Sequence, residues 1–203
     1  MGMLLRVLFS ATLTLYCFYV LKNSWLVAIP VAIALVNIVV ARNRKVVVKI
    51  PFVRIGLDLK GALIPLASSI AIFILAQAKQ CLEFFALLAS LAIVLSALNT
   101  IVMERLFAVN VMCYTLLYYI ASYMLCGSNY LYLYALPLTT QIGIIIGSDI
   151  LHYAYIRRCS SNLVLVIGGA EECDAIYLST VLIQWLEILR QIVIILIFSV
   201  RLV

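Results

Sequence analysis

Residues 130–156 read YLYLYALPLTTQIGIIIGSDILHYAYI. These 27 residues contain one carboxylate, Asp149, and one histidine, His152, in otherwise uncharged and mostly apolar sequence. An α-helix crosses the hydrocarbon core of a bilayer with about 20 predominantly apolar residues. A single strand in the same place would leave its backbone groups without hydrogen bonds in lipid. The stretch therefore predicts a membrane-spanning helix.

The rest of the chain repeats this character. Of its 203 residues, 67% are hydrophobic and 11% are charged, whereas soluble domains average about 45–50% apolar and about 25% charged residues. A soluble chain of this length has no interior large enough for so much apolar surface. We therefore predict one all-α integral membrane domain over residues 1–203, a polytopic bundle of seven or eight spans without strands. The expected spans are residues 3–21, 25–41, 61–78, 84–103, 106–126, 130–156 and 163–186, followed by a last apolar stretch at 191–203.

Two segments leave alternatives open. Near the C-terminal end, Glu187 and Arg190 interrupt the apolar sequence. This region fits either one long tilted helix or a re-entrant piece at 163–175 followed by a span at 176–200. Residues 46–60 alternate apolar and polar side chains, which indicates an irregular or short amphipathic element along the membrane interface.

Lysine and arginine are distributed asymmetrically between the loops. With the N-terminus inside, ten of them fall on the inner side, and only Lys22 and Lys79 fall in the outer loops before residue 160. The positive-inside rule then predicts a cytoplasmic N-terminus and a cytoplasmic basic segment at 42–60, between the second and third spans of a cell-membrane protein. The net charge of +6 is therefore a topology signal and a contact for anionic head groups, not a sign of nucleic-acid binding.

Motifs for cofactors and metals are missing from the sequence. The six cysteines are scattered without CxxC spacing, which argues against a zinc site or a disulfide framework. The chain also lacks a phosphate loop, a haem motif, a Ser-His-Asp arrangement and an HExxH signature. We expect no cofactor and no metal ion. The expected partners are the lipid bilayer and either a membrane-embedded peptide or a cation, with the oligomeric state left open.

Carboxylates inside the apolar runs are the candidate functional residues. An ionisable side chain in hydrocarbon costs about 2.5–3.5 kcal/mol on insertion scales, so it usually faces a partner or a water-filled cavity. Asp149 lies eight residues before Arg157, and Asp174 lies twelve residues after Asn162. If both segments are helical, the two carboxyl groups lie about 12 Å and 18 Å from these boundaries. Consecutive antiparallel helices would bring them close together.

Helical periodicity assigns polar neighbours to this pair. At about 100° per residue, Gln141, Ser148 and His152 share one helix face, with Asp149 at its edge. On the next segment, Asp174 shares a face with two further polar residues. The expected proton-relay or supporting residues are His152, Glu171, Tyr177, Ser148 and Gln141.

Glycines mark two other features of these segments. Gly143 and Gly147 lie on the opposite side of the helix from the polar face, at a spacing that lets another helix approach closely. Gly168 and Gly169 come just before Asp174 and indicate a loosened or broken helix, which is tolerated beside protein or water.

Three hypotheses follow from the acid pair. Two carboxyl groups in one low-dielectric site cannot both ionise, so they share a proton near neutral pH. Such a pair can activate water for amide hydrolysis, as in aspartic proteases, which makes Asp149 and Asp174 the catalytic residues of an intramembrane aspartyl hydrolase. It equally suits proton or cation coupling in a small transporter or channel. The third hypothesis is a non-catalytic scaffold or assembly protein, in which polar residues only hold helices together.

Three stretches resemble the motifs of a known family. Residues 61–65 (GALIP) resemble GGALIP, residues 147–152 (GSDILH) resemble GADLLH, and residues 167–178 (IGGAEECDAIYL) resemble IGGAGxFDGIFL. These motifs belong to the membrane family called domain of unknown function 1614, and the resemblance implies a polytopic protein of a bacterial or archaeal plasma membrane. Gly61 and Pro65 belong to its first motif. Both aspartates match, whereas Lys60, Ser148, Glu171, Cys173 and Ala175 depart from the pattern.

A weaker likeness connects the aspartates to the GxGD-type, presenilin-like intramembrane aspartyl proteases. In that group one catalytic aspartate lies on an inward span and the second lies, within GxGD, on the next outward span. Asp149 and Asp174 have the same order and the same predicted direction. The chain departs from the group by having EECD at residues 171–174 and no C-terminal Pro-Ala-Leu.

Overall fold

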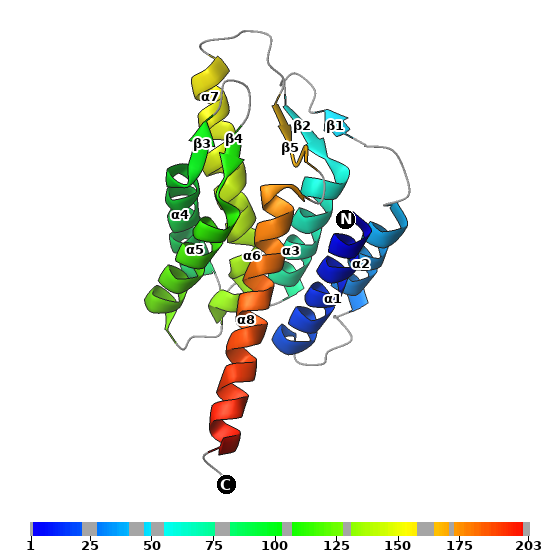
Figure 1. Ribbon diagram of the computed structural model, residues 1–203, viewed down its shortest axis with the longest axis vertical. Helices are drawn as coiled ribbons and strands as arrows, with labels where there is room; N and C mark the ends of the chain where they lie inside the picture. The colour runs from blue at the N-terminus through cyan, green and yellow to red at the C-terminus, as the bar shows by residue number, and fades with distance from the viewer. Residues whose placement is uncertain are drawn as a thin grey trace.

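The computed structural model describes most of the chain as a bundle of helices with short strands at one end (Figure 1). The described residues are 2–21, 28–40, 47–49, 55–75, 82–102, 107–127, 131–157, 165–170 and 173–200. The α-helices are α1 (Gly2–Val20), α2 (Ala28–Val40), α3 (Ile64–Leu75), α4 (Leu82–Leu98), α5 (Val111–Cys126), α6 (Leu131–Gly143), α7 (Leu151–Arg157) and α8 (Ala175–Val200).

Two π-helical stretches interrupt or begin these helices. The stretch η2 (Leu59–Leu63) leads directly into α3, and η4 (Ile144–Ile150) joins α6 to α7 in one continuous helix. In a π-helix each N–H bonds to the carbonyl five residues earlier, so each turn is wider than an α-helical turn. Such stretches are short and rare, and they occur frequently at functional sites.

Five short strands form two small sheets near the same end of the bundle (Figure 1). The strands are β1 (Val47–Lys49), β2 (Ile55–Asp58), β3 (Thr100–Val102), β4 (Phe107–Val109) and β5 (Leu165–Ile167). One sheet has the order β1-β2-β5, in which β1 is antiparallel and β5 is parallel to β2. The other sheet is the antiparallel pair of β3 and β4. The helical class is as expected, but three expected spans contain short strands at one end (β3, β4 and β5), because paired strands satisfy backbone groups that an isolated strand in lipid would leave free.

The strands also correct the limits of three expected spans. The span expected at 84–103 ends at Leu98, and the span expected at 106–126 begins as a helix only at Val111. The span expected at 163–186 begins with β5 and a turn, and its helix starts at Ala175. From there α8 is continuous to Val200, so the structure is nearer to the alternative of a non-helical piece followed by a span.

Helix α6 lies in the middle of the bundle and contacts α3, α4 and α8. Tyrosine hydroxyls fix its backbone and side chains to its neighbours. Tyr114 donates a 2.8 Å hydrogen bond to the carbonyl of Thr140, and Tyr16 donates a 2.5 Å hydrogen bond to the carbonyl of Leu133. Because Tyr16 belongs to α1 and Tyr114 to α5, these bonds hold α6 between helices from both halves of the chain.

The described residues have an inverted distribution of polarity. Large apolar side chains face outward, for example Met3 on α1, Leu98 on α4 and Met124 on α5, each about three-quarters exposed. The buried residues include many polar ones, among them Gln141, Gln184 and Glu187. A soluble protein buries its apolar side chains in its core. A membrane protein can expose them, because the surrounding lipid is as apolar as such a core. The surface of the bundle is thus suited to hydrocarbon.

Length and composition support the same conclusion. Within the described ranges, three helices are long and apolar enough to cross a membrane: Met3–Val20, Tyr132–Ala154 and Ala175–Ile197. Three shorter apolar helices accompany them, at Leu59–Leu75, Phe84–Leu98 and Val111–Cys126. The chain is a membrane helix bundle. The number of seven or eight spans and the cytoplasmic N-terminus stay predictions.

Helix α8 differs from the other helices in reach. Its first half packs against α1, α5 and α6, whereas its last part extends beyond the rest of the bundle (Figure 1). Leu189, Ile192 and Ile195 of this part are each about half exposed or more. The extension is therefore an apolar helical segment without protein around it.

Candidate functional site

The three motif segments meet at the end of the bundle that carries the strands. Strand β2 runs directly into η2, and β5 lies parallel to β2 with Leu57 opposite Ile167. Gly168 follows β5 and touches the first motif so closely that a Cβ atom there would lie 2.6 Å from the backbone nitrogen of Ala62. Its φ of +78° also favours glycine. Since η4 contacts both β5 and α8, segments far apart in sequence form one site.

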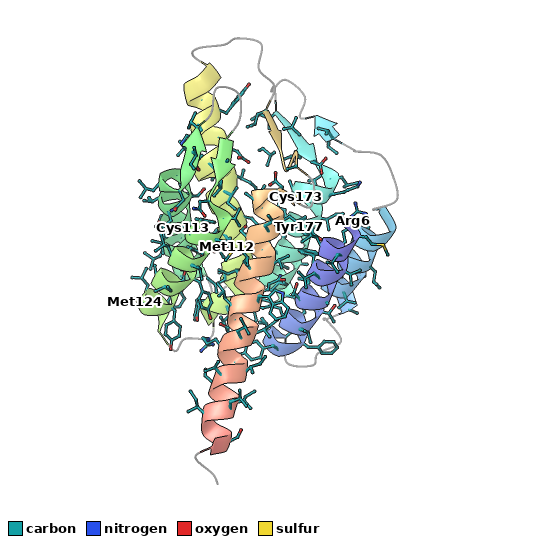
Figure 2. The ribbon with its side chains drawn as sticks, viewed as in Figure 1. Arg6, Met112, Cys113, Met124, Cys173 and Tyr177 are labelled. Atoms are coloured by element: carbon teal, nitrogen blue, oxygen red, sulfur yellow. The ribbon has the colours of Figure 1, made fainter. Side chains whose placement is uncertain are left out.

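Asp149 and Asp174 are brought together in this site. Asp149 lies in η4 and is partly exposed, and Asp174 immediately precedes α8. The two carboxyl groups are near enough to repel each other electrostatically. One oxygen of Asp174, Oδ1, accepts a 3.0 Å hydrogen bond from the backbone N–H of Ile176, so this side chain caps the N-terminal end of α8. Figure 2 shows Cys173 and Tyr177 where α8 begins.

The π-helical stretch sets the direction in which Asp149 faces. In a regular α-helix Asp149 would lie roughly 80° away from Gln141 around the axis. In η4 each turn takes about 4.4 residues, so each residue rotates the chain by less than in an α-helix. The smaller rotation brings Asp149 to within roughly 20° of Gln141 around the axis. With ideal π-helical turns, the residues that share a face beyond Gly143 differ from those of a regular α-helix, and Asp149 comes into line with Gln141, a buried polar residue of α6.

Gln141 joins three helices inside the bundle. Its Nε2 donates hydrogen bonds of 2.8 Å to Ser69 Oγ on α3 and to Thr180 Oγ1 on α8. Its Oε1 is buried, and no described residue gives it a hydrogen bond. Ser148 is also fully buried, and its hydroxyl lies beside the carboxyl group of Asp149, with which it interacts. Gln141 thus carries a buried oxygen that the surrounding described side chains leave unsatisfied.

His152 and Tyr177 each donate hydrogen bonds to backbone carbonyl groups. The Nδ1–H of His152 donates to the carbonyls of Ser148 and Gly147 at 2.8 and 3.1 Å. The hydroxyl of Tyr177 donates to the carbonyl of Leu5 at 3.3 Å on α1. These bonds hold the histidine to its own helix and the tyrosine to α1. Glu171 lies outside the described residues.

The predicted packing glycines lie against other elements. A Cβ atom on Gly143 would lie 2.7 Å from Ala92 Cβ, and one on Gly147 would overlap the carbonyl of Ile93. Helix α4 therefore packs directly on this face of α6 and η4. Gly169 has more room, because its nearest neighbour would be the carbonyl oxygen of Val166 at 3.1 Å.

The first motif contributes a charged residue that sequence reasoning missed. Asp58 is fully buried, and its Oδ1 accepts hydrogen bonds from the backbone N–H groups of Lys60 (3.0 Å) and Gly61 (2.9 Å), capping η2. Its Oδ2 has no hydrogen-bond partner among the described residues. The signal was an aspartate three residues before the glycine of GALIP, the position from which a side chain caps a helix.

Lys60 is a charged residue whose burial was not expected from the sequence. It was counted in the basic segment 42–60 as a topology signal, and in the structure its side chain is 4% exposed. Pro65 is buried at the start of α3, where its carbonyl accepts a 2.7 Å hydrogen bond from Ser68 Oγ. The motif thus buries one anion and one cation next to Gly168. Across the described part of the chain, no group of three or more His, Cys, Asp or Glu side chains is placed to hold a metal ion.

The family model described as "Protein of unknown function (DUF1614)" matches residues 28–186. The chain belongs to this family. All three motif segments and both aspartates lie within the matched part, whereas α1 and the C-terminal part of α8 lie outside it. Searches of curated proteins and of solved structures found no match for this DUF1614 chain.

Proposed function

We propose that this DUF1614 chain is an intramembrane aspartyl hydrolase of a prokaryotic plasma membrane, with Asp149 and Asp174 as its catalytic pair. The proposal is supported most directly by the electrostatic interaction of Asp149 with Asp174, which come from two consecutive helices whose segments η4 and α8 contact each other. The continuous helix that carries Asp149 and the helix that Asp174 begins run in opposite directions (Figure 1). The substrate class is a peptide embedded in the membrane.

The surroundings of the two carboxyl groups suggest separate roles. Asp174 sits at a helix N-terminus, where backbone N–H groups favour an anion. It is therefore the base that removes a proton from the attacking water. Asp149 is the acid that donates its proton to the carbonyl oxygen of the peptide bond. When the tetrahedral intermediate breaks down, the proton held by Asp174 passes to the leaving nitrogen and the C–N bond is cleaved, while one hydroxyl of the intermediate returns its proton to Asp149 as the C=O bond re-forms.

Cleavage of membrane peptides by the purified protein tests this proposal. The protein is reconstituted in liposomes with a panel of fluorescent transmembrane peptides, and Asp149→Asn and Asp174→Asn are compared with the wild type. Each substitution should abolish cleavage with expression unchanged. Cys113→Ser, an exposed position on α5, serves as the control that keeps activity. Cleavage that persists in either aspartate variant contradicts the proposal.

The same variants separate the other two hypotheses. Ion flux that depends on Asp149, together with no cleavage by the wild type, would favour the transporter. A wild type with neither cleavage nor ion flux, in which both aspartates can be replaced with only modest loss of stability, would favour the scaffold. The exposed thiol of Cys173, next to Asp174, offers a further probe. An impermeant thiol reagent should reach it from the cytoplasmic side if the N-terminus is cytoplasmic.

A further inference from the structure

Polar side chains follow the contact between α6 and α8 from the acid pair toward the other end of the bundle. On α8, Thr180, Gln184 and Glu187 are all fully buried and share one face at helical spacing. On α6 and η4, Ser148 and Gln141 are fully buried. We call these five residues, together with the buried Tyr132 of α6, the polar column.

The polar column contains both donors and acceptors that lack partners. Within the described residues, no hydrogen bond reaches Gln141 Oε1, Tyr132 Oη or either amide atom of Gln184. Gln141 Nε2 is already used on Ser69 and Thr180, so its Oε1 can only accept. Gln184 Nε2 can only donate. Each unsatisfied buried group of this kind costs about 1–3 kcal/mol.

The mixture of donors and acceptors among these unpartnered groups indicates which kind of ligand could form hydrogen bonds with all of them. A cation would bind the free oxygens but would be repelled by the N–H groups of Gln184. An anion would bind those N–H groups but not Gln141 Oε1. Water both donates and accepts, and buried water typically makes about three hydrogen bonds to such groups. The mixed donors and acceptors therefore select water over an ion.

The polar column is long enough to extend across most of the thickness of the hydrocarbon core. From Asp174 to Glu187 the helix rises about 20 Å, and from Ser148 to Tyr132 it rises about 24 Å. The hydrocarbon core is about 30 Å thick. At the far end, the carboxylate of Glu187 accepts from Tyr119 Oη (2.8 Å), Arg190 and Gln191. A fixed charge pair thus bounds the column at one end, and the acid pair bounds it at the other.

We propose that water molecules bound along the polar column carry protons between the Asp149/Asp174 pair and the opposite end of the bundle. Each transfer breaks one O–H bond of a water or carboxyl donor and forms one O–H bond on the next water, so no electron is gained or lost. This proton conduction is an activity separate from peptide hydrolysis and does not depend on it. Gln184 is the central residue of the polar column, since both of its amide atoms are buried without a hydrogen-bond partner among the described residues and can bind these water molecules.

Proton flux into liposomes that contain a trapped pH-sensitive dye tests the proposal. With a potassium diffusion potential as driving force, the wild type should acidify the interior at least tenfold faster than empty liposomes. Gln184→Leu should reduce this rate at least tenfold, because it removes both amide groups. Ser96→Ala, which removes a buried and unpartnered hydroxyl on α4 outside the column, should leave the rate within twofold.

Two results would overturn the proposal: a wild-type rate equal to that of empty liposomes, or an unchanged rate in Gln184→Leu. If Gln184→Leu does not fold, Gln184→Met gives the same test with a flexible apolar side chain of similar length. Peptide cleavage is measured on the same preparations. Flux lost with cleavage intact supports the column, and a wild type without cleavage removes only the hydrolase proposal, because the flux comparison stands by itself.

Discussion

The two ends of the polar column treat buried charge in different ways. At the Glu187 end, Arg190 donates two hydrogen bonds to the carboxylate, at 2.6 and 2.9 Å, and Tyr119 and Gln191 donate one each. At the acid end, Asp58 keeps one oxygen without a hydrogen bond among the described residues, and Asp149 lies in electrostatic contact with a like charge. The carboxylate of Glu187 therefore has several hydrogen-bond donors, whereas the carboxyl groups at the acid end have fewer.

This difference separates structural from functional use of charge. The Glu187–Arg190 ion pair lies within α8, and the hydrogen bond from Tyr119 connects it to α5, so this charge serves to hold helices in place. Two neighbouring carboxyl groups that interact unfavourably cost stability, and folded proteins keep such arrangements mainly where chemistry requires them. The comparison predicts that substitutions at the Glu187 end change stability and that substitutions of the acid pair change activity.

The largest expected effect is on activity. Asp149→Asn should lower the rate of peptide cleavage at least a thousandfold, equivalent to about 4 kcal/mol in the activation free energy. The free energy of unfolding should change by less than about 1 kcal/mol, because the substitution removes a repulsion while keeping the shape of the side chain. Cleavage kinetics and denaturant unfolding in detergent measure the two quantities. A variant that loses both equally would place Asp149 with Glu187 as a structural residue.

The next effect is on stability at the other end. Glu187→Ala should lower the free energy of unfolding by about 2–4 kcal/mol, since it leaves Arg190, Tyr119 and Gln191 without their acceptor. Cleavage by the fraction that remains folded should be within severalfold of the wild type. Unfolding followed by circular dichroism measures the loss. The double variant Glu187→Ala/Arg190→Ala is the control and should be less destabilised than the sum of the single changes.

A smaller loss of stability is expected at the junction of the motifs. Gly168→Ala should cost about 2–3 kcal/mol, because it combines a positive φ with an overlap on Ala62. Gly127→Ala is the matched control: its φ of +57° is also positive, but nothing lies within 4 Å of the added methyl group. It should cost only about 1 kcal/mol. Equal losses in thermal unfolding would mean that contact between β5 and η2 contributes nothing.

The smallest expected effect concerns Asp58. Asp58→Asn keeps an oxygen to cap η2 and removes the charge, so the free energy of unfolding should change by less than about 0.5 kcal/mol. Asp58→Ala removes the cap as well and should cost about 1–2 kcal/mol. The difference between the two variants measures whether Asp58 acts as a cap or as a charge. A strong loss of cleavage in Asp58→Asn would add this residue to the catalytic group.

Hydropathy predicted the helices well because lipid imposes one rule on every residue of a span. The described limits of α1 and α2 agree with the expected spans to within a few residues. The pairing of Asp149 with Asp174 was expected from their similar depth on consecutive helices and stays a prediction. Membership of the DUF1614 family, expected from three short motifs, is confirmed by the match over residues 28–186.

Other features depend on contacts that one sequence does not display. The strands β2 and β5 exist because each pairs with the other across more than a hundred residues of chain. The burial of Lys60 follows from that pairing, whereas composition alone placed it in a basic loop. The π-helical register of η4 changes which residues face inward, and the apolar pattern of Ile144, Ile145 and Ile146 carries no trace of it.

The unequal lengths of the helices have a consequence for the lipid around the protein. Helix α8 has 26 residues and is about 39 Å long, whereas α5 has 16 residues and is about 24 Å long. A bilayer of uniform thickness cannot match both. A bilayer that surrounds both helices would become locally thinner beside α5. Beside α8 it would become locally thicker, or α8 would tilt. If both helices cross the membrane, we expect the bilayer to be thinner beside α5 than beside α8, so that thin membranes match α5 and thick membranes match α8.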